Sequence, residues 1–374
     1  MRMMSVLVEI MAEYVVTRLF RPKHVWLKIT STANSVKRET AMNTASTPNI
    51  AVAQSVTIST TSIKNLPINL FGSVMGLAGL GLAWRLNGHY FGIGGQLGEA
   101  IGAFAGLVFV LLTLGYLTKW FKHPEAVRGE FNHPVASNFF GTVTIALLLL
   151  SAVAAPHSRL LGEALWILGS VLTVLLAGLV VSRLLSGAQD PLNAVPAWLI
   201  PGVATLDIAV TGAHMPMVWA AEFNMFALAV GAVLALVFYT RIFSRLVHQA
   251  PLAKGMVPSL MVLIAPFEVG FLAYTNVFGE IDRFASVLFY FGLFLFVVLS
   301  FKVFRRDVPF APSWWAISFP IAALSNAALK YAHAQDNTVL MVIAVLILLF
   351  LTMALSVLTL KTLSSLVRGR LLAN

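Results

Sequence analysis

The sequence predicts an all-α integral membrane protein of ten transmembrane helices, arranged as five tandem helical hairpins around a central path. The first observation is composition, because 59% of the 374 residues are hydrophobic and only 11% are charged. Soluble domains carry about 25% charged residues. The second observation is a regular recurrence of proline, and the third is the confinement of polar side chains to alternate apolar stretches.

Proline marks the first helix of each predicted hairpin. Pro67, Pro134, Pro201, Pro266 and Pro320 follow one another at steps of 67, 67, 65 and 54 residues. Such a step is about the length of two membrane-spanning helices with their turns. The second apolar stretch of each pair has no proline in its interior. Five marked helices at regular spacing indicate a ring around a path, and therefore a pore.

Apolar runs of about 18 or more residues locate the ten spans. They cover residues 67–84, 96–118, 135–155, 159–182, 197–213, 217–240, 256–277, 284–301, 313–332 and 337–360.

The basic residues orient these spans in the membrane. Of the 25 Lys and Arg residues, 21 fall in the two tails and the loops that follow even-numbered spans. Arg85, Arg159 and Arg283 fall on the opposite side, and Lys330 lies inside a span. Basic loops stay in the cytoplasm, so we expect both termini to be cytoplasmic. The net charge of +10 then reflects topology, and nucleic acid is not an expected partner.

The sequence predicts three parts along the chain. Residues 1–64 form a cytoplasmic tail that we expect to be disordered, because residues 29–63 are rich in Ser, Thr, Asn and Ala. Translation from Met42, with residues 1–41 an over-long gene prediction, is an alternative, and an interfacial amphipathic helix ahead of the first span is another. The transmembrane domain covers 65–361, and 362–374 form a short cytoplasmic tail.

Polar residues distinguish the two helices of each hairpin. Even-numbered spans consist mainly of Leu, Val, Ala and Phe, so we expect them to face lipid. Polar groups within a bilayer face the bundle interior or a hydrated cavity, which places the odd-numbered spans inside. The polar residues of the odd-numbered spans are Asn69, Ser73, Ser137, Asn138, Thr142, Thr144, Thr205, Asp207, Thr211, Glu268, Tyr274, Thr275, Ser318, Ser325 and Asn326.

Two backbone features are expected to shape the helices. Pro201, Pro266 and Pro320 lie inside their spans and remove backbone donors, so we predict kinks there. Gly94, Gly98, Gly102 and Gly106 follow a four-residue spacing that lets a neighbouring helix approach closely. Helix packing explains these glycines better than a dinucleotide-binding loop, because the third glycine of that motif and the preceding strand are missing.

Several stretches resemble one known family. They are Asn65–Gly72 (NLPINLFG), Ala83–Arg85 (AWR), His133–Ala136 (HPVA), Leu263–Pro266 (LIAP), Trp314–Pro320 (WWAISFP) and Leu329–Ala332 (LKYA). In order and spacing they are similar to the tellurite-resistance/dicarboxylate transporter family, which includes the plant slow-type anion channels. The resemblance covers roughly residues 65–361.

The resemblance implies a quasi-fivefold arrangement of the five hairpins, a pore in each subunit, and a homotrimer. It implies an anion as the transported species: chloride or nitrate as in the plant channels, or dicarboxylates or sulfite as in fungal relatives. It also implies that a phenylalanine blocks the pore midway, and the corresponding residue here is Phe319.

Phe319 and Lys330 can also be interpreted from the sequence without the resemblance. Phe319 directly precedes Pro320, and an inward ring there would make a dry constriction that gates the pore. Ordinary core packing is the alternative for one of 26 phenylalanines. Lys330 lies three helical turns further on, so both side chains can share a face. Lys330 would attract anions to the outer mouth, or else extend to the headgroups.

Asp207 and Glu268 are the acids inside the odd-numbered predicted spans. Intramembrane carboxyl groups often carry protons in transporters, so either residue could couple proton movement to anion transport. An acid–base pair with Lys330 and a position facing a hydrated vestibule or another helix are the other interpretations.

No residue set in the sequence predicts catalysis. There is no cysteine, and His123, His133 and His214 lack metal-site spacing. We therefore expect no enzyme activity, cofactor or metal. The sequence predicts an anion channel, or channel-like transporter, of the inner (plasma) membrane. The alternative is a proton-coupled carrier for four-carbon dicarboxylates such as malate, for sulfite or for tellurite-type oxyanions.

Overall fold

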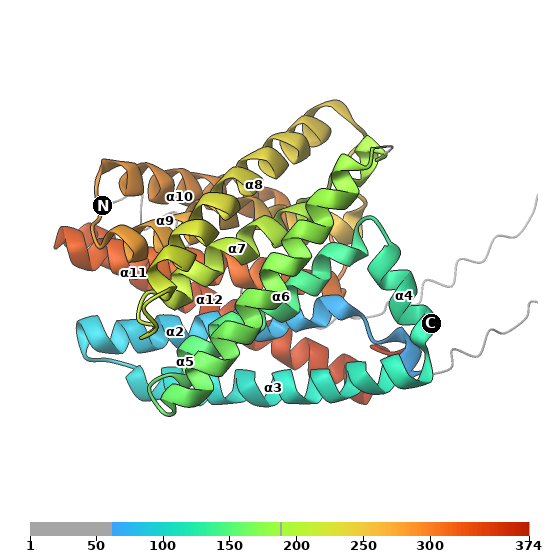
Figure 1. Cartoon of the computed structure of the whole chain (residues 1–374), viewed down its shortest axis with the longest axis horizontal. Helices are drawn as coiled ribbons and strands as arrows, with labels where there is room; N and C mark the ends of the chain where they lie inside the picture. The colour runs from blue at the N-terminus through green and yellow to red at the C-terminus, as the bar shows by residue number, and fades with distance from the viewer. Residues whose placement is uncertain (1–61, 188, 374) are drawn as a thin grey trace, which may run out of the picture. The chain divides into compact units, whose positions relative to one another are not determined.

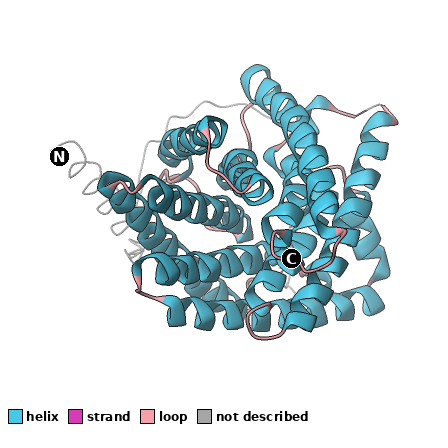
Figure 2. Cartoon of the chain, turned by 60° about the vertical axis from the view of Figure 1, so that its left-hand side comes forward, coloured by secondary structure: helices cyan, strands magenta, loops and turns pink. Residues whose placement is uncertain are grey.

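The structure is a computed structural model that describes residues 62–187 and 189–373. Nearly all of the predicted N-terminal tail, with the alternative start at Met42, lies outside the described residues. Within them all regular structure is helical, as Figure 2 shows in cyan. The all-α prediction is confirmed for this part of the chain.

Five segments combine a short 3₁₀ helix with a following α-helix. They are η2 (Ile68–Phe71) with α2 (Gly72–Phe91), η3 (Ala136–Phe139) with α5 (Phe140–Ala154), η5 (Pro196–Trp198) with α7 (Leu199–Gly212), η6 (Lys254–Ile264) with α9 (Ala265–Phe278), and η7 (Pro312–Ile317) with α11 (Ser318–Gln335).

Five longer α-helices alternate with these segments. They are α3 (Gly95–Lys122), α6 (Arg159–Leu185), α8 (Ala220–His248), α10 (Arg283–Val303) and α12 (Thr338–Val367). The short helices η1 (Ile63–Asn65), α4 (Pro124–Asn132) and η4 (Pro191–Asn193) complete the described chain. Helix α4 was not predicted. Proline at its first position and Glu125 in its first turn favour a helix start there.

The contacts between helices follow a simple order. Each of the five composite segments packs against the long helix that follows it in the chain. Helices α2, α5, α7, α9 and α11 also contact one another in sequence, and α11 contacts α2, so their contacts close a circuit. Figure 1 shows these elements running lengthwise beside one another.

Within residues 62–187 and 189–373, seven helical segments are long and apolar enough to cross a membrane by length and composition. They are Gly95–Lys122, Ala136–Ala154, Arg159–Leu185, Ala220–His248, Lys254–Phe278, Arg283–Val303 and Thr338–Val367. Each overlaps a predicted span. The other three predicted spans correspond to α2, to α11 and to Pro196–Gly212, which is apolar but shorter.

Burial separates the two kinds of segment. In the most apolar stretch of Ala136–Ala154, 72% of the residues are buried, against 11% in Gly95–Lys122. Most of the polar residues predicted to lie inside are buried, among them Ser137, Thr205 and Ser325, whereas Asn69, Tyr274 and Asn326 are partly buried. The long helices instead expose large apolar side chains, as α3 does at Leu111.

Glycine residues allow α3 to lie close to α2. Gly92 (φ 74°) and Gly94 (φ 88°) form the turn between these helices with left-handed backbone. A Cβ atom at Gly98 would lie 2.6 Å from the Gly81 carbonyl oxygen, so a side chain would force the helices apart. Gly106 of the same row meets open space. Gly94, Gly98 and Gly102 therefore allow close packing, whereas Gly106 does not need to be glycine for that reason.

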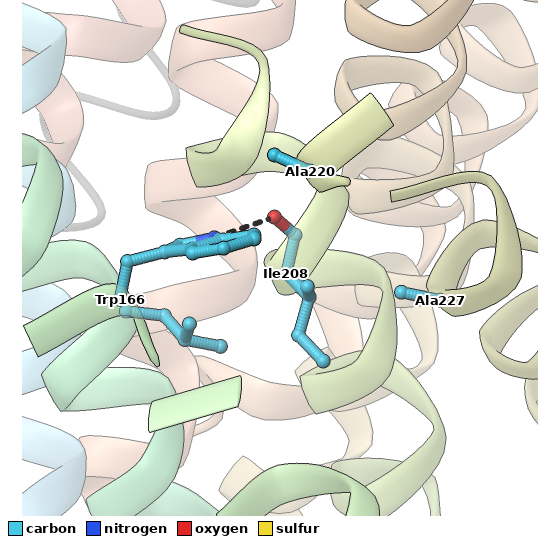
Figure 3. Packing of buried hydrophobic residues seen from close by; sticks show 5 residues of the cluster. Trp166, Ile208, Ala220 and Ala227 are labelled. Carbon is cyan, nitrogen blue, oxygen red and sulfur yellow. Dashed lines mark hydrogen bonds between the residues drawn. The ribbon is translucent and has the colours of Figure 1, made fainter. Parts of the chain in front are cut away.

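The long helices also pack on the backs of the composite segments. Trp166 of α6 donates its indole N–H to the Ile208 carbonyl oxygen of α7 at 3.1 Å. Leu148 of α5 and Ala220 and Ala227 of α8 complete this buried cluster, part of which is labelled in Figure 3. Because Ile208 faces this cluster, its neighbour Asp207 projects from a different side of α7.

Candidate functional site

Two cavities lie among the five composite segments. The first, the narrow cavity, has a volume of about 190 Å³ and receives residues from all five segments. It lies at the N-terminal ends of the five α-helices. Its lining is mostly apolar. The lining residues on the α-helices and at their starts include Gly72, Met75, Thr142, Ile145, Ile200, Val203, Val262, Ala265, Ala316 and Phe319.

The second, the wide cavity, has a volume of about 660 Å³ and receives residues from the same five α-helices. Its lining is more polar and includes four basic side chains and one acid. These basic and acidic residues are Arg85, His89, Asp207, His214 and Lys330.

The lining residues follow helical periodicity from one cavity into the other. On α7, Ile200 and Val203 line the narrow cavity, while Asp207 and Val210 line the wide cavity. Steps of three and four residues place these side chains on one face of a helix. Helix α7 thus presents a single face to both cavities.

Phe319 lies where the two cavities meet. Among the described residues it alone lines both. Its exposed fraction is 7%, and it is the second residue of α11, directly after the 3₁₀ helix η7. A large aromatic ring therefore occupies the boundary between the cavities.

The three prolines predicted to kink helices share one position. Pro201 and Pro320 are the third residues of α7 and α11, and Pro266 is the second residue of α9. All three prolines therefore lie within the first three residues of their α-helices, just after the junction with the 3₁₀ helix.

Lys330 lines the wide cavity, and its ammonium group is held by neutral acceptors. Lys330 Nζ donates to Thr275 Oγ1 at 2.8 Å and to Asn276 Oδ1 at 2.6 Å. Asn276 Nδ2 in turn donates to the Val210 carbonyl oxygen at 2.8 Å. No ion pair joins Lys330 to Asp207 or Glu268 in the described part of the chain.

Asp207 and Glu268 occupy different environments. Asp207 is 1% exposed and lines the wide cavity, and its Oδ2 atom has no hydrogen-bond partner among the described residues. Glu268 is completely buried and lines neither cavity. Its carboxyl group points at α10, where a Cβ atom at Gly292 would overlap Glu268 Oε1. Of the two acids, only Asp207 faces the space between the five helices.

Arg85 belongs to the wide cavity and was not among the predicted site residues. Its Nε and Nη2 atoms donate to the two carboxylate oxygens of Glu99 at 2.7 and 2.8 Å. Nη1 and Nη2 also donate to the carbonyl oxygens of Ala152 and Val153. The charge of Arg85 is thus balanced by a bidentate carboxylate. The sequence feature that could have indicated this ion pair is an acid 14 residues after an arginine, on the other side of a glycine-rich turn.

Comparison with known proteins identifies the family. The model of the voltage-dependent anion channel family matches residues 65–363. An uncharacterized transporter of Methanocaldococcus jannaschii is 26% identical over 69% of this chain and 82% of its own length. The S-type anion channel SLAH3 of Arabidopsis thaliana is 26% identical over 79% of this chain but 48% of its own length.

A third relative comes from a bacterium. The tellurite resistance protein TehA homolog of Haemophilus influenzae is 26% identical over 82% of this chain and 92% of its own length. The family matched here consists of integral membrane channels and transporters of anions. The match covers all five composite segments and the long helices between them, so this chain belongs to the voltage-dependent anion channel family.

Proposed function

We propose that this protein is an anion channel, or channel-like anion transporter, of the inner (plasma) membrane that passes small anions such as chloride or nitrate. The observation that carries the proposal is the meeting of two cavities at Phe319, both lined by the same five helices. Together the cavities form a path interrupted by one side chain. Each subunit would hold its own path.

The architecture proposed for this path is ten membrane-spanning helices, arranged as five hairpins with quasi-fivefold symmetry. The pairing of each composite segment with the following long helix supports it, as does the closed circuit of contacts among α2, α5, α7, α9 and α11. Helices α2 and α11 carry Arg85, Lys330 and several polar residues, which lowers their hydropathy. Helices inside a bundle tolerate such residues because they face a cavity instead of lipid.

The orientation proposed places the narrow cavity toward the cytoplasm and the wide cavity outside. The distribution of Lys and Arg supports cytoplasmic termini. The two ends of the described chain lie together, since Ser62 N–H donates to the Leu372 carbonyl oxygen at 3.1 Å. The transmembrane domain would cover 65–361 between two cytoplasmic tails, and a homotrimer in the lipid bilayer is the proposed assembly.

Phe319 would act as the gate. A pore closed by an apolar ring expels water and so blocks hydrated ions. Rotation of the ring, or its removal, would join the two cavities. Pro201, Pro266 and Pro320 would support this gate by fixing the junctions between 3₁₀ and α-helix next to it.

A second candidate function is a proton-coupled carrier for dicarboxylates, sulfite or tellurite-type oxyanions. The position of Asp207 favours it, because this acid lines the wide cavity one helical turn after Val203 of the narrow cavity. A carboxyl group there could take up and release a proton as the anion passes. Glu268 would contribute only after a movement of α9, since it faces α10.

The deciding experiment compares currents through wild-type protein and Phe319→Ala in planar bilayers, in chloride, nitrate and malate at two pH values. Large anion currents in Phe319→Ala that do not depend on pH would support a gated channel. Absence of current in both proteins, together with proton-linked malate or sulfite flux in liposomes, would support the carrier instead.

A further inference from the structure

Besides the narrow and wide cavities, a third cavity lies between the C-terminal end of α6, the 3₁₀ helices η3 and η5, and α8. This side cavity has a volume of about 300 Å³. Figure 1 shows the end of α6 and the short helix α4 on the same side of the bundle. Its lining combines polar side chains with apolar ones, among them Asn132, Ser137, Arg183, Leu184, Trp198 and Phe238.

Arg183 is the one charged residue among the described residues that line the side cavity. Its Nη1 atom donates to the Phe131 carbonyl oxygen at 2.7 Å, and its Cζ atom lies 4.6 Å from the centroid of the Phe131 ring. Nε and Nη2 have no acceptor within the described chain. Arg85 uses the same two atoms to bind both carboxylate oxygens of Glu99. Arg183 therefore offers a free edge suited to an anion with two oxygens.

No acid neutralises Arg183 in the part of the chain that the structure describes. Two acids lie close in sequence to the lining residues, and neither lines the side cavity. Glu130 is bound by Lys119 at 2.9 Å and by the Tyr116 hydroxyl at 2.6 Å. Asp190 caps the short helix η4. Arg183 thus keeps an unbalanced positive charge beside the cavity.

The remaining lining supplies one more donor and an apolar wall. Ser137 is 5% exposed, and its hydroxyl group has no hydrogen-bond partner within the described residues. Leu184, Trp198 and Phe238 come from three different helical segments, α6, η5 and α8. A ligand that fits this lining has one negative charge, several acceptor oxygens and an apolar part.

We propose that the side cavity binds a phosphate group, with Arg183 as the bidentate donor and the Ser137 hydroxyl group as a further donor. The planar guanidinium group matches the spacing of phosphate oxygens. The position of the cavity favours a phospholipid as the source of the phosphate, because Arg183 lies two residues from the end of α6, a helix long and apolar enough to cross a membrane. Basic pockets at the ends of membrane spans bind lipid head groups.

The charge balance and the apolar wall support the same source. The phosphodiester of a phospholipid carries a single negative charge, which one unbalanced arginine neutralises. Leu184, Trp198 and Phe238 would contact the glycerol unit and the first methylene groups of the lipid. This inference goes beyond the proposed anion path and does not depend on it.

The side cavity and the narrow cavity share a wall. In η3, Asn138 lines the side cavity, and the next residue, Phe139, lines the narrow cavity. In η5, Trp198 lines the side cavity, and the preceding residue, Ala197, lines the narrow cavity. A bound head group would therefore hold in place two 3₁₀ helices that also form the wall of the narrow cavity.

Thermal unfolding of the purified full-length protein in an uncharged detergent measures the binding. Phosphatidylglycerol supplies a phosphodiester, diacylglycerol supplies the same chains without phosphate, and glycerol 3-phosphate supplies phosphate without chains. A ligand that binds the folded state raises the unfolding midpoint with concentration. We expect a saturable rise with phosphatidylglycerol and none with diacylglycerol. An equal rise with glycerol 3-phosphate would support the phosphate site and assign it to a soluble ligand.

Arg183→Gln should weaken binding of phosphatidylglycerol by at least about tenfold, because the charge and the bidentate edge are both lost. Arg183→Lys keeps the charge without that edge and should bind more weakly than the wild type. The matched control is Arg241→Gln. Arg241 is an exposed residue of α8 that does not line the cavity, so its loss removes the same charge and should leave binding unchanged.

A second pair of variants tests the site if Arg183→Gln does not fold. Asn132 is exposed and lines the side cavity, so its substitution leaves the core intact. Asn132→Asp adds a negative charge and should weaken binding, whereas Asn132→Ala should retain it. The inference would be overturned by a wild type that does not respond to phosphatidylglycerol, by an equal rise with diacylglycerol, by equal losses in Arg183→Gln and Arg241→Gln, or by equal binding in the two Asn132 variants.

Discussion

Arg85 and Glu99 form a bidentate ion pair that joins α2 to α3 at the edge of the wide cavity, with N–O distances of 2.7 and 2.8 Å. The same guanidinium group reaches the last carbonyl oxygens of α5 through Ala152 and Val153. One side chain therefore fixes three helices and is also neutralised by its partner.

Glu99→Gln should destabilise the protein and make the wide cavity more positive. Loss of a half-buried bidentate partner should cost about 1–3 kcal/mol of unfolding free energy, and the freed charge of Arg85 should raise anion current at low salt, where screening is weak. Thermal unfolding and bilayer currents measure the two effects. The control is Glu163→Gln, which breaks the surface pair with Arg159, a residue 77% exposed, and should change neither quantity appreciably.

Phe319→Ala should raise anion conductance strongly, with Phe319→Leu between it and the wild type, because the blocked cross-section falls with side-chain volume. Single-channel current in bilayers measures the series. Phe271 is fully buried but lines neither cavity. Phe271→Ala should therefore lower stability by about 3–5 kcal/mol without opening a path. Equal conductance of Phe319→Ala and wild type at normal expression would rule out the gate.

Gly98→Ala should separate α2 from α3. Its Cβ atom would lie 2.6 Å from both the Gly81 carbonyl oxygen and the Arg85 backbone nitrogen, and such overpacking costs about 1–3 kcal/mol. Gly106→Ala is the matched control on the same helix, since nothing lies within 4 Å of its Cβ position. That change should be neutral or stabilising, because alanine is the better helix former. Thermal unfolding of both variants tests the pair, and similar losses would contradict this account of the helix contact.

Asp282 should make the stability of α10 depend on pH. Its carboxylate caps the helix by accepting the Ala285 N–H at 2.9 Å and also accepts the Tyr274 hydroxyl at 2.8 Å. These hydrogen bonds hold the pKa of Asp282 below its ordinary value, and the bond from the Ala285 N–H has the largest effect. A lowered pKa in the folded state stabilises the protein above the unfolded-state pKa, near 4 for Asp, and this contribution disappears as the pH falls through the folded-state pKa.

The corresponding measurement is unfolding of wild type and Asp282→Ala from pH 3 to pH 7. The variant should be less stable at neutral pH, and the difference should narrow in acid. Asn337 caps α12 through Val339 and Leu340 without an ionisable group. Asn337→Ala should therefore lose stability by a similar amount throughout the range. A constant deficit for Asp282→Ala as well would refute the electrostatic part of the cap.

If the protein couples protons to anion movement, Asp207→Asn should abolish that coupling and Glu268→Gln should leave it intact. The reason is position, because only Asp207 lines a cavity. Anion uptake and internal pH are followed together in liposomes. Loss of coupling in Glu268→Gln alone would show that α9 turns toward the path during transport. Wild-type uptake without any pH change would exclude the carrier.

Local features of the sequence were sufficient to locate the ten longer helical segments, but not the short helix α4. Helix positions follow from the length of apolar runs, because backbone hydrogen bonds in a bilayer must be satisfied within the chain. The exposed apolar side chains of α3, such as Leu111, and the buried polar residues of α5, such as Thr144, follow from composition alone. The sequence could not indicate that each composite segment begins as a 3₁₀ helix, since Pro67 and Pro134 precede such segments while Pro201 lies beyond one.

Which side chains meet depends on the tertiary structure. Asp207 and Glu268 look alike in sequence, yet one faces the wide cavity and the other faces Gly292. The direction of each depends on the rotation of its helix about its own axis, and that rotation is set by packing between distant segments. The ten longer helical segments, their polarity and the candidates Phe319 and Lys330 could be predicted from the sequence. Only the assembled helices placed Phe319 between two cavities and gave Lys330 its neutral partners, because both depend on contacts between residues far apart in the chain.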